Sequence, residues 1–327
     1  MAKLAGVSTA TVSNALNRPE IVSELTRERV QQAIEELDFV PNRAAATLRQ
    51  GYNRLLGLVI PDISNPFYAA IVDAVVDTAD RHRYAVALCA SHDDPDRERR
   101  HLAVLAEQRA AGALVVPLTA DSSRLAQLRL VGSHLIVIDR VADTAESCSV
   151  AVDDVMGGRL AVSHLLSCAG EGITLVNGSL TIPQCADRRE GAAQAMREGG
   201  HEESSMIEYD VAEMTVDAGL EIARRIVADR APRRVFCTND QLATGIMRGL
   251  AAAGLRIPED ASVVGYGDLS LESPERPLLT TVVQPKKALG EVSVALLLEE
   301  LTEGEAHQHV ARILQPELVV RASTRPA

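Results

Sequence analysis

From Leu55 onward, short runs of apolar and β-branched residues alternate with longer amphipathic stretches. The runs predict about nine β-strands, which lie at 55–60, 84–90, 112–118, 134–139, 149–152, 172–178, 234–239, 262–267 and 280–283. The amphipathic stretches predict helices at 67–81, 96–111, 154–166, 188–198, 216–228 and 241–253. Strands that alternate with helices form parallel sheets with helices on both faces. Because so many strands suit two sheets better than one very wide sheet, the pattern predicts an α/β protein with two doubly wound lobes.

Polar residues stand at the carboxyl ends of most of these runs. They are Asp62, Asp93, Asp139, Asp153, Asn177, Asn239, Asp240 and Asp268. Ligands bind at this edge of open α/β sheets, so a cleft lined by carboxylates and amides would suit a polyhydroxylated or similarly polar small molecule. Asp and Asn also cap helices, and capping explains each single position equally well.

The residues before Pro41 follow a different, all-helical pattern. Gly6 marks a turn, and Ser8 after it can cap a helix over 9–16. A helix, a short turn with glycine and a second helix are typical of the helix-turn-helix motif. On the second helix, Val12 and Leu16 are four residues apart and are expected to face the core.

The other faces of that helix carry short polar side chains, which suit contacts with a DNA groove and with phosphates. A further helix is predicted over about 24–37, with Ser23 as its cap and an apolar stripe along one face. The stripe consists of Val30, Ala33, Ile34 and Leu37. Three small helices would make a DNA-binding head, and a helical extension or a dimerisation arm is the alternative.

The 327 residues carry a formal net charge of −12, which taken alone argues against a nucleic-acid binder. Residues 1–53 hold six basic and six acidic residues, however, and the rest holds 27 basic against 39 acidic ones. A neutral head can still bind DNA if its few basic side chains face the phosphates. No apolar run reaches the ~20 residues of a membrane-spanning helix, and the N-terminus lacks the apolar stretch of a signal peptide, so a cytoplasmic protein is expected.

Residues that could carry metal, redox or catalytic chemistry are scattered. The five cysteines lie at least 17 residues apart and are interpreted as buried thiols. His307 and His309 form a close pair with no nearby cysteine or acidic cluster shaped like a metal site, so a solvated loop is expected there. GxxxxGK[ST], a complete dinucleotide fingerprint, GxSxG and HExxH are absent. We therefore expect no cofactor and no metal, and an enzyme would depend on scattered carboxylates alone.

Three segments carry a more specific signal than the single motifs above. They are AGVSTATVSNALN, VSELTRERVQQAIEELDFVPNRAAATLRQG and LLGLVIPDISNPFY. They are followed along the chain by VIDR, VDDVMGGRLAVSHLL, TNDQLATGIMRGL, IPEDASVVGYGD, PLLTTVVQP and PELVVRAST. In this series the chain resembles the lactose/galactose-repressor family of bacterial transcription regulators. The resemblance covers essentially the whole chain, and it implies a helix-turn-helix head, a hinge helix and an effector domain of the periplasmic-binding-protein type.

The resemblance places the second helix in the major groove, where Thr9, Ala10 and Asn14 select the operator sequence. Asn14 could pair bidentately with adenine, and Ala10 could touch a thymine methyl group. Positions that contact phosphates or hold the helix on the DNA backbone match Ser8, Thr11, Ser13, Asn17, Ser23 and Thr26.

Residues 42–50 resemble the hinge helix, although an Ala-rich linker helix explains the same segment. In the family a leucine of this helix enters the minor groove and kinks the DNA, and Leu48 matches it. Asn42 and Arg49 are the other DNA-contacting residues that the resemblance implies here.

The family pattern also implies an effector site between the lobes, without a nucleophile or a general base. Lobe 1 would contribute Asn65, Phe67, Tyr68, Asp93, Asp139 and Arg140. Lobe 2 would contribute Arg188, Met214, Asn239, Asp240 and Gln284. Arg188 and the carboxylates would bind hydroxyl groups through charge-assisted hydrogen bonds, and an aromatic ring would lie against an apolar sugar face.

The chain departs from the family pattern in the expected effector site and in the first helix. Gly267 replaces a carboxylate that commonly binds a sugar hydroxyl, and Met214 stands where an aromatic residue often stacks. Both changes favour a polar effector other than a common hexose. The first helix is represented by about one turn only, so weaker packing on Val7, Val12 and Leu16 and a weaker affinity for DNA are expected.

The expected domains are a shortened DNA-binding head (1–41), a hinge helix with linker (42–53) and an effector-binding and dimerisation domain (54–327). Within the last, lobe 1 would comprise about 54–153 and 284–313, and lobe 2 about 154–283 and 314–327. The function implied is a homodimeric repressor that binds a palindromic operator and responds to a small polar effector such as a sugar. The alternatives are a cytoplasmic solute-binding protein with a degenerate head, and a sugar-processing enzyme with paired carboxylates such as Asp153 and Asp154.

Overall fold

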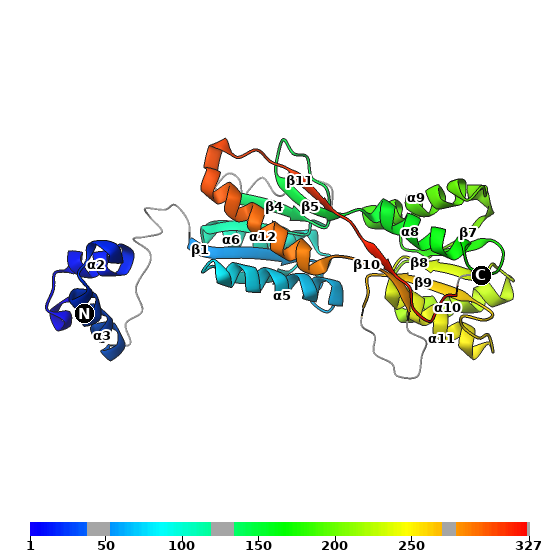
Figure 1. Cartoon of the computed structure of the whole chain (residues 1–327), viewed down its shortest axis with the longest axis horizontal. Helices are drawn as coiled ribbons and strands as arrows, with labels where there is room; N and C mark the ends of the chain where they lie inside the picture. Colours follow the sequence, from blue (N-terminus) through cyan, green and yellow to red (C-terminus); the bar gives the residue numbers. More distant parts are fainter. Residues whose placement is uncertain (38–52, 119–133, 270–278, 326–327) are drawn as a thin grey trace. The chain divides into compact units, whose positions relative to one another are not determined.

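The computed structural model describes residues 1–37, 53–118, 134–269 and 279–325, and the chain divides into two compact units, Met1–Tyr52 and Asn53–Ala327 (Figure 1). Within residues 1–37, the elements are α1 (Ala2–Ala5), α2 (Thr9–Asn17), the 3₁₀ turn η1 (Pro19–Ile21) and α3 (Glu24–Glu36). The helices share a small core, which consists of Ala5, Val12, Val30 and Ala33.

The helix starts in the first unit follow the sequence closely. The Ser8 side chain accepts a hydrogen bond from the Thr11 backbone N–H at 3.0 Å, which confirms that Ser8 caps α2. Ser23 stands at the cap position of α3, but its hydroxyl donates to Thr26 Oγ1 and makes no capping bond to the backbone. The prediction for Leu16 was wrong, since its side chain is 38% exposed and α2 turns Val12 and Ala15 toward the core instead.

The apolar stripe of the third helix is shorter than predicted. Val30 and Ala33 are buried and Ile34 packs against them, whereas Leu37 is exposed at the C-cap of α3. The first helix is a single turn that Gly6 ends with a left-handed backbone (φ 63°). Although it is short, this helix buries Ala5, and Met1 and Ala2 pack against the same core, so all three helices contribute to it.

The second unit contains two six-stranded sheets, which confirms the predicted pair of doubly wound lobes. The sheet of lobe 1 has the order β11-β5-β4-β3-β1-β2 and is parallel throughout. Its strands are β1 (Asn53–Ile60), β2 (Ala85–Ala90), β3 (Ala110–Val115), β4 (His134–Ile138), β5 (Cys148–Val152) and β11 (Ala311–Leu314). The helices that pack on it are α5 (Pro66–Arg81), α6 (Pro95–Glu107) and α12 (Lys286–Glu303).

The sheet of lobe 2 has the order β12-β10-β9-β8-β6-β7, and only β12 runs antiparallel to its neighbour. Its strands are β6 (Ile173–Asn177), β7 (Met206–Asp210), β8 (Arg234–Cys237), β9 (Ser262–Tyr266), β10 (Thr280–Val283) and β12 (Glu317–Val319). Its helices are α8 (Asp154–Leu166), α9 (Pro183–Glu198), α10 (Val216–Ala228) and α11 (Asp240–Ala252). The described residues of the second unit also include the 3₁₀ turns η3 (Glu203–Ser205) and η4 (Gly304–Ala306).

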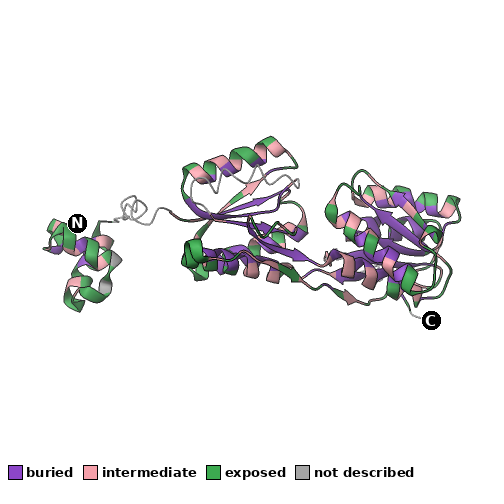
Figure 2. Cartoon of the chain, turned by 90° about the horizontal axis from the view of Figure 1, so that it is seen from above, coloured by how far each residue is buried: buried purple, intermediate pink, exposed green. Residues whose placement is uncertain are grey.

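Buried residues concentrate on the strands and on the inner faces of the helices (Figure 2). In lobe 2, α8 and α9 cover one core and α10 and α11 cover the other, as expected for a doubly wound sheet. Cys148, Cys168, Cys185 and Cys237 are buried as predicted, whereas Cys89 is only partly buried. Among the described residues, no helix has both the length and the hydrophobicity that a membrane crossing demands.

Two predicted helices have different bounds in the structure. The helix predicted to end at Ala111 ends at Glu107, because Ala110 and Ala111 already belong to the buried strand β3. The helix predicted from Arg188 begins at Pro183, which suits the first turn because proline has no N–H to leave unpaired. Strands β7, β11 and β12 and helix α12 were not predicted.

Among the described residues, the chain passes between the lobes at three short segments, residue 153, residues 284–285 and residues 315–316. Two of these segments are hydrogen-bonded to each other. The Asp153 backbone N–H donates to the Leu314 carbonyl at 2.9 Å, and Gln315 Nε2 donates to Asp153 Oδ2 at 3.4 Å. Short connections of this kind allow two rigid lobes to move as bodies.

Helices α8 and α9 meet backbone to backbone at two glycines. A Cβ at Gly191 would collide with the Val155 carbonyl, and one at Gly158 would collide with the Arg188 carbonyl. Only glycine allows the two helices to approach this closely. The approach brings Asp154 of α8 beside Arg188 of α9.

Gly191→Ala should therefore lower the free energy of unfolding by about 1–3 kcal/mol, because the added methyl group must push the two helices apart. Urea unfolding followed by circular dichroism measures this change. Glu190→Ala, at an exposed position on the same helix, is the control and should stay within about 0.5 kcal/mol of the unsubstituted protein. Equal stability of the two variants would contradict the close packing of α8 and α9.

Candidate functional site

Several polar residues at the strand exits act as helix caps, so that part of their side chain serves the fold. Asn65 Oδ1 accepts from the Phe67 N–H at 3.0 Å, and Asp153 Oδ1 accepts from the Met156 N–H at 2.9 Å. Both polar atoms of the Asn239 side chain have partners within lobe 2. Its Oδ1 accepts from the Leu242 N–H, and its Nδ2 donates to the carbonyl of Met214. At Asn239, capping explains the residue better than ligand binding does.

Asp240 is also built into lobe 2. Its side chain is fully buried, Oδ1 accepts from the Thr281 hydroxyl at 2.7 Å and Oδ2 accepts from the Leu269 N–H at 2.6 Å. Both oxygens therefore hold β10 and the segment after β9 in place. Burial raises the pKa of Asp240, and the hydrogen bond from Thr281 acts in the opposite direction.

Three strand exits have an unusual backbone. Asp93, Asp139 and Asp268 adopt left-handed conformations, with φ of 56°, 65° and 49°. Such conformations are uncommon for residues other than glycine and collect at functional sites. All three residues lie just beyond the carboxyl ends of strands, where α/β sheets bind ligands.

Arg188 lies at the centre of a buried network in lobe 2. Its Nε donates to Asp154 Oδ1 at 2.8 Å and its Nη1 donates to the Thr238 carbonyl at 2.8 Å. The guanidinium carbon lies 3.8 Å from the centre of the Tyr266 ring, and the Tyr266 hydroxyl donates to the same Asp154 oxygen at 2.6 Å. Burial opposes the charge on Arg188, but the Asp154 carboxylate outweighs it and the pKa of Arg188 is raised.

Asp139 stands at the exit of β4 in lobe 1 and is only 7% exposed. Gln184 of α9, in lobe 2, donates from Nε2 to Asp139 Oδ2 at 2.9 Å and to the Asp139 carbonyl at 2.8 Å. Burial, with the nearby charge of Asp154, raises the pKa of Asp139 to about 7. The charge of Arg188 and the hydrogen bond from Gln184 limit this rise.

Buried polar atoms without a partner identify the part of the site that could receive a ligand. Among the described residues, the structure has four such side-chain atoms, which are Asp139 Oδ1, Arg140 Nε, Asn177 Oδ1 and Glu300 Oε2. The first three lie at the ends of β4 and β6, two in lobe 1 and one in lobe 2. Leaving a buried polar group unpaired costs free energy, so these atoms suit a ligand with both donors and acceptors.

An aromatic pair lies close to these groups. Phe67 and Tyr68 contact edge to face with ring centres 5.1 Å apart, and Phe67 is buried. Burial raises the pKa of Tyr68, and the charges of Asp139 and Asp93 raise it further. These charges act on Tyr68 only because the groups are close, so the structure gathers the aromatic pair and the carboxylates at one edge of lobe 1.

The other predicted effector residues lie in lobe 2 or beside it. Met214 Sδ is 3.8 Å from Cys185 Sγ and 3.9 Å from Thr238 Oγ1, next to the carbonyl that Arg188 binds. Gln284 is buried, and its Oε1 would be 3.8 Å from a Cβ at Gly267. The glycine that replaces the usual carboxylate therefore adjoins a predicted site residue.

Sequence reasoning missed four residues of this arrangement. The sequence pointed to Asp154 only as one member of a carboxylate pair and to Asn177 only as a polar residue at a strand end. It gave no reason to select Gln184 or Tyr266. Asp154, Gln184 and Tyr266 act through partners at distances of 34, 45 and 112 residues along the chain. The carboxylate beside Arg188 had one sequence signal, the Asp153 and Asp154 pair at the start of α8.

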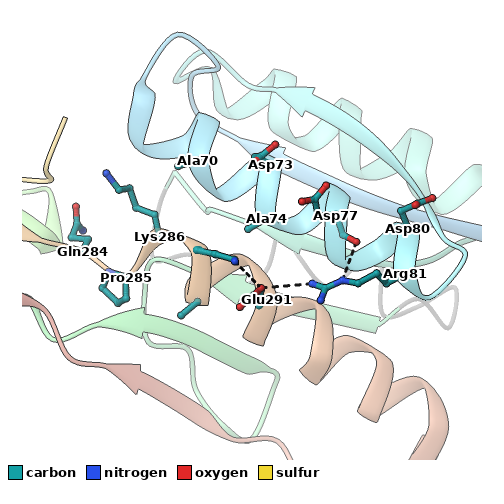
Figure 3. Close-up of a pocket in the computed structure, with 12 residues that line it drawn as sticks. Ala70, Asp73, Ala74, Asp77, Asp80, Arg81, Gln284, Pro285, Lys286 and Glu291 are labelled. Carbon is teal, nitrogen blue, oxygen red and sulfur yellow. Dashed lines mark hydrogen bonds and ion pairs between the residues drawn. The ribbon is translucent and has the colours of Figure 1, made fainter. Parts of the chain in front are cut away.

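A surface pocket lies elsewhere, over the first turns of α12 and the exposed face of α5 (Figure 3). Its charged lining includes Asp73, Asp77, Asp80, Arg81, Lys286 and Glu291. Arg81 Nη2 lies 3.6 Å from Glu291 Oε1, and Lys287 Nζ lies 3.8 Å from the same oxygen. Gln284 is the one predicted effector residue in this lining. The pocket is therefore distinct from the groups around Asp139.

The predicted DNA-binding residues form an exposed surface on α2. Thr9, Ala10, Ser13 and Asn14 are exposed, whereas Thr11 is half-buried and its hydroxyl is hydrogen-bonded to that of Ser8. Ser23 and Thr26 are bonded to each other at the start of α3. The side chain of Asn17 lies outside the described residues, as do the hinge residues Asn42, Leu48 and Arg49.

Two family models match parts of the chain. Residues 1–42 match the family described as bacterial regulatory proteins, lacI family, and residues 173–324 match the periplasmic binding protein-like domain. The HTH-type transcriptional repressor PurR of Haemophilus influenzae is 33% identical over 99% of this chain and 97% of its own.

Solved structures agree with these matches. A lac repressor dimer bound to operator and the anti-inducer ONPF is 28% identical with a TM-score of 0.84, over 98% of this chain and 97% of that one. A LacI family regulator from Enterococcus faecium with bound ribose is 29% identical with a TM-score of 0.75, over 84% of this chain and 99% of that one. These relatives are regulators and repressors, which confirms the expectation of a regulator over an enzyme. The chain belongs to the lacI family of bacterial regulatory proteins and is a DNA-binding transcriptional regulator.

Proposed function

We propose that this chain is a homodimeric repressor that binds a near-palindromic operator and is controlled by a small, polar, sugar-like effector. The observation that carries the effector site is a set of three buried atoms that have no hydrogen-bond partner among the residues that the structure describes, namely Asp139 Oδ1, Arg140 Nε and Asn177 Oδ1. The ligands of two similar structures, ribose and ONPF, support an effector of this size and polarity. In the same proposal the protein acts in the cytoplasm, because its operator lies there.

The three parts of the chain have separate roles in this proposal. Residues 1–41 read the operator, residues 42–53 connect the head to the lobes and place Leu48 in the minor groove, and residues 54–327 bind the effector and form the dimer. Two heads related by a two-fold axis match the symmetry of a palindromic operator.

The effector site combines residues from both lobes. One effector hydroxyl could donate to Asp139 Oδ1 and a second to Asn177 Oδ1, and a hydroxyl oxygen could accept from Arg140 Nε. The edge-to-face pair of Phe67 and Tyr68 offers an apolar ring surface. Arg188 then acts from within lobe 2, where Asp154 fixes its position. Asn65, Met214, Asn239, Asp240 and Gln284 belong to the wall of the site and hold its shape.

The control mechanism follows from where the lobes meet. Gln184 of α9 donates to both the side chain and the backbone carbonyl of Asp139 in lobe 1. An effector that binds Asp139 and Asn177 at once would favour one angle between the lobes over another. Only this difference in affinity between two arrangements can change operator binding.

An enzymatic role for the paired carboxylates finds no support in their geometry. Asp153 caps α8, and Asp154 shares one oxygen between Arg188 and the Tyr266 hydroxyl. A solute-binding protein with a degenerate head is also disfavoured. The head keeps a packed core and an exposed polar face on α2 although α1 is a single turn.

A panel of pentoses, hexoses, disaccharides and nucleobases would test the effector proposal by thermal unfolding and by operator titration. A compound that raises the midpoint and also changes operator affinity supports the proposal. A compound that raises the midpoint and leaves operator affinity unchanged would contradict effector control.

Asn14→Ala should weaken operator binding by about 10–100-fold, because one bidentate contact to a base contributes about 1–3 kcal/mol. Fluorescence anisotropy with operator and with scrambled DNA measures both affinities, and the second should not change. Gln31→Ala, on the exposed face of α3, is the control. Loss of affinity for both DNAs alike would contradict base recognition by Asn14.

At about pH 8, where Asp139 with its pKa of about 7 is mostly ionised, Asp139→Asn should lower effector affinity at least about 10-fold, because the amide removes the charge from a charge-assisted hydrogen bond. Operator affinity without effector should be unchanged. Isothermal titration with the effector measures the loss, and Asp77→Asn on the exposed face of α5 is the matched control. Unchanged effector affinity in Asp139→Asn would remove Asp139 from the site.

Asp139 should also make the stability of the protein depend on pH. Its pKa is about 7 in the folded protein against 3.8 for an ordinary Asp, so between these values the folded state holds one proton more. The free energy of unfolding should therefore fall as pH rises from about 4 to about 7, by at most about 4 kcal/mol from this group. Urea unfolding at about pH 5 and about pH 8 measures the slope. The same slope in Asp139→Asn as in the unsubstituted protein would assign it to other groups.

A further inference from the structure

Four potential metal ligands meet in lobe 1, at the edge of the sheet where the strands begin. The strand exits described above lie at the opposite edge. Cys148 begins β5, Glu300 lies in the last turn of α12, and His307 and His309 lie between η4 and β11. One ligand atom from each residue lies within 4.8 Å of all the others. The solvated loop predicted for the two histidines was wrong.

The fold explains why these residues meet. Strand β11 pairs in parallel with β5, and the Ser149 N–H donates to the Val310 carbonyl at 3.0 Å. This pairing brings the segment before β11 beside the start of β5. A cysteine 159 residues before His307 in the sequence thereby becomes its neighbour.

The spacing of the ligand atoms suits a tetrahedral ion. Cys148 Sγ lies 3.2 Å from His307 Nε2 and 3.8 Å from His309 Nδ1, and His309 Nδ1 lies 4.0 Å from Glu300 Oε2. Bonds of about 2.0–2.3 Å at tetrahedral angles place neighbouring ligand atoms roughly 3.3–3.8 Å apart. Small side-chain movements are enough to close the remaining difference.

In two of the four residues, the side-chain atom that faces away from the cluster already has a hydrogen-bond partner. His307 Nδ1 lies 2.7 Å from Glu303 Oε2, so its N–H donates there and the Nε2 lone pair faces the cluster. Glu300 Oε1 lies 3.0 Å from His134 Nδ1, which leaves Oε2 for the cluster. Metal-binding histidines are commonly oriented by a carboxylate in this way.

Glu300 Oε2 gives an independent indication of a missing partner. The Glu300 side chain is only 10% exposed, and Oε2 is buried without a hydrogen bond among the described residues. The imidazole of His307 is 4% exposed. A buried carboxylate oxygen without a partner is costly, and a cation among these four residues would satisfy it.

We propose that Cys148, Glu300, His307 and His309 bind one divalent transition-metal ion, with zinc as the best fit. One thiolate, two imidazoles and one carboxylate form a ligand set for zinc and not for calcium or magnesium, which bind oxygen. Because all four ligands come from the chain, the site is closed and structural. The ion joins β5, the end of α12 and the segment before β11, and it therefore stabilises lobe 1 at the edge where β1 begins.

Cobalt titration of the full chain, freed of metal and of any polyhistidine tag, tests the site directly. One Co²⁺ per chain should produce a thiolate-to-cobalt charge-transfer band and the strong visible bands of tetrahedral cobalt. Zn²⁺ should abolish both sets of bands and raise the midpoint of thermal unfolding by several degrees. Cobalt binding without the charge-transfer band, or no binding, would overturn the proposal.

Substitutions at His309, which is half-buried, and at Glu303, which is exposed, should leave the fold intact. His309→Gln should lower Co²⁺ affinity by 100-fold or more, and His82→Gln, on the exposed end of α5, should not. Glu303→Gln should lower it about 10–100-fold through the orientation of His307, and its exposed neighbour Glu305→Gln should not. Equal affinity in His309→Gln and the unsubstituted protein, or equal losses in the controls, would overturn the assignment.

Cys148→Ser should remove the charge-transfer band. Because Cys148 is buried, circular dichroism must first show a folded variant, and Cys89→Ser on β2 is the matched cysteine control. A charge-transfer band that persists in Cys148→Ser and disappears in Cys89→Ser would place the thiolate elsewhere and overturn the proposal. The titration of His309→Gln decides the question if Cys148→Ser does not fold.

Discussion

Lobe 2, with the part of the proposed effector site that it contributes, depends on the buried ion pair between Arg188 and Asp154. A guanidinium and a carboxylate can be buried only when their charges are matched and hydrogen-bonded, and here the partners are 2.8 Å apart. The two glycines where α8 meets α9 make this distance reachable. Because Gln184 lies one turn before Arg188 on α9, the same constraint aims its amide at Asp139 of lobe 1. A pair inside one lobe therefore sets a contact between the two lobes.

The site also shows how one residue type serves two purposes at the edge of a parallel sheet. Asp153 and Asn239 each use a side-chain oxygen to cap a helix, and Asp240 uses both of its oxygens within lobe 2. Asp139 follows β4 and Asn177 ends β6, yet each retains one buried oxygen that has no hydrogen-bond partner in the described part of the chain. The difference lies in the groups that surround each side chain, so structural residues can be told apart from the proposed ligand-binding residues only when the fold is known.

The sequence predicted the interior strands of both sheets and the edge strand β2, but not the other three edge strands. Central strands are buried on both faces and read as continuous apolar runs, whereas the missed strands β7, β11 and β12 all lie at sheet edges with mixed polarity. Family resemblance gave Asp139 and Arg188 as site residues, but the partners of Arg188 come from distant segments that no local pattern connects. The same reason hid the cluster around His307, since its cysteine lies on a neighbouring strand and far away in sequence.

The central claim is that a DNA-reading head and an effector-binding pair of lobes act as one regulator. Sequencing of genomic fragments retained by the purified protein tests it most directly, with and without a compound that the lobes bind. The account predicts enrichment of one near-palindromic site, whose recovery changes when the compound is added. Retention without a shared sequence, or a shared site whose recovery the compound does not alter, would contradict it.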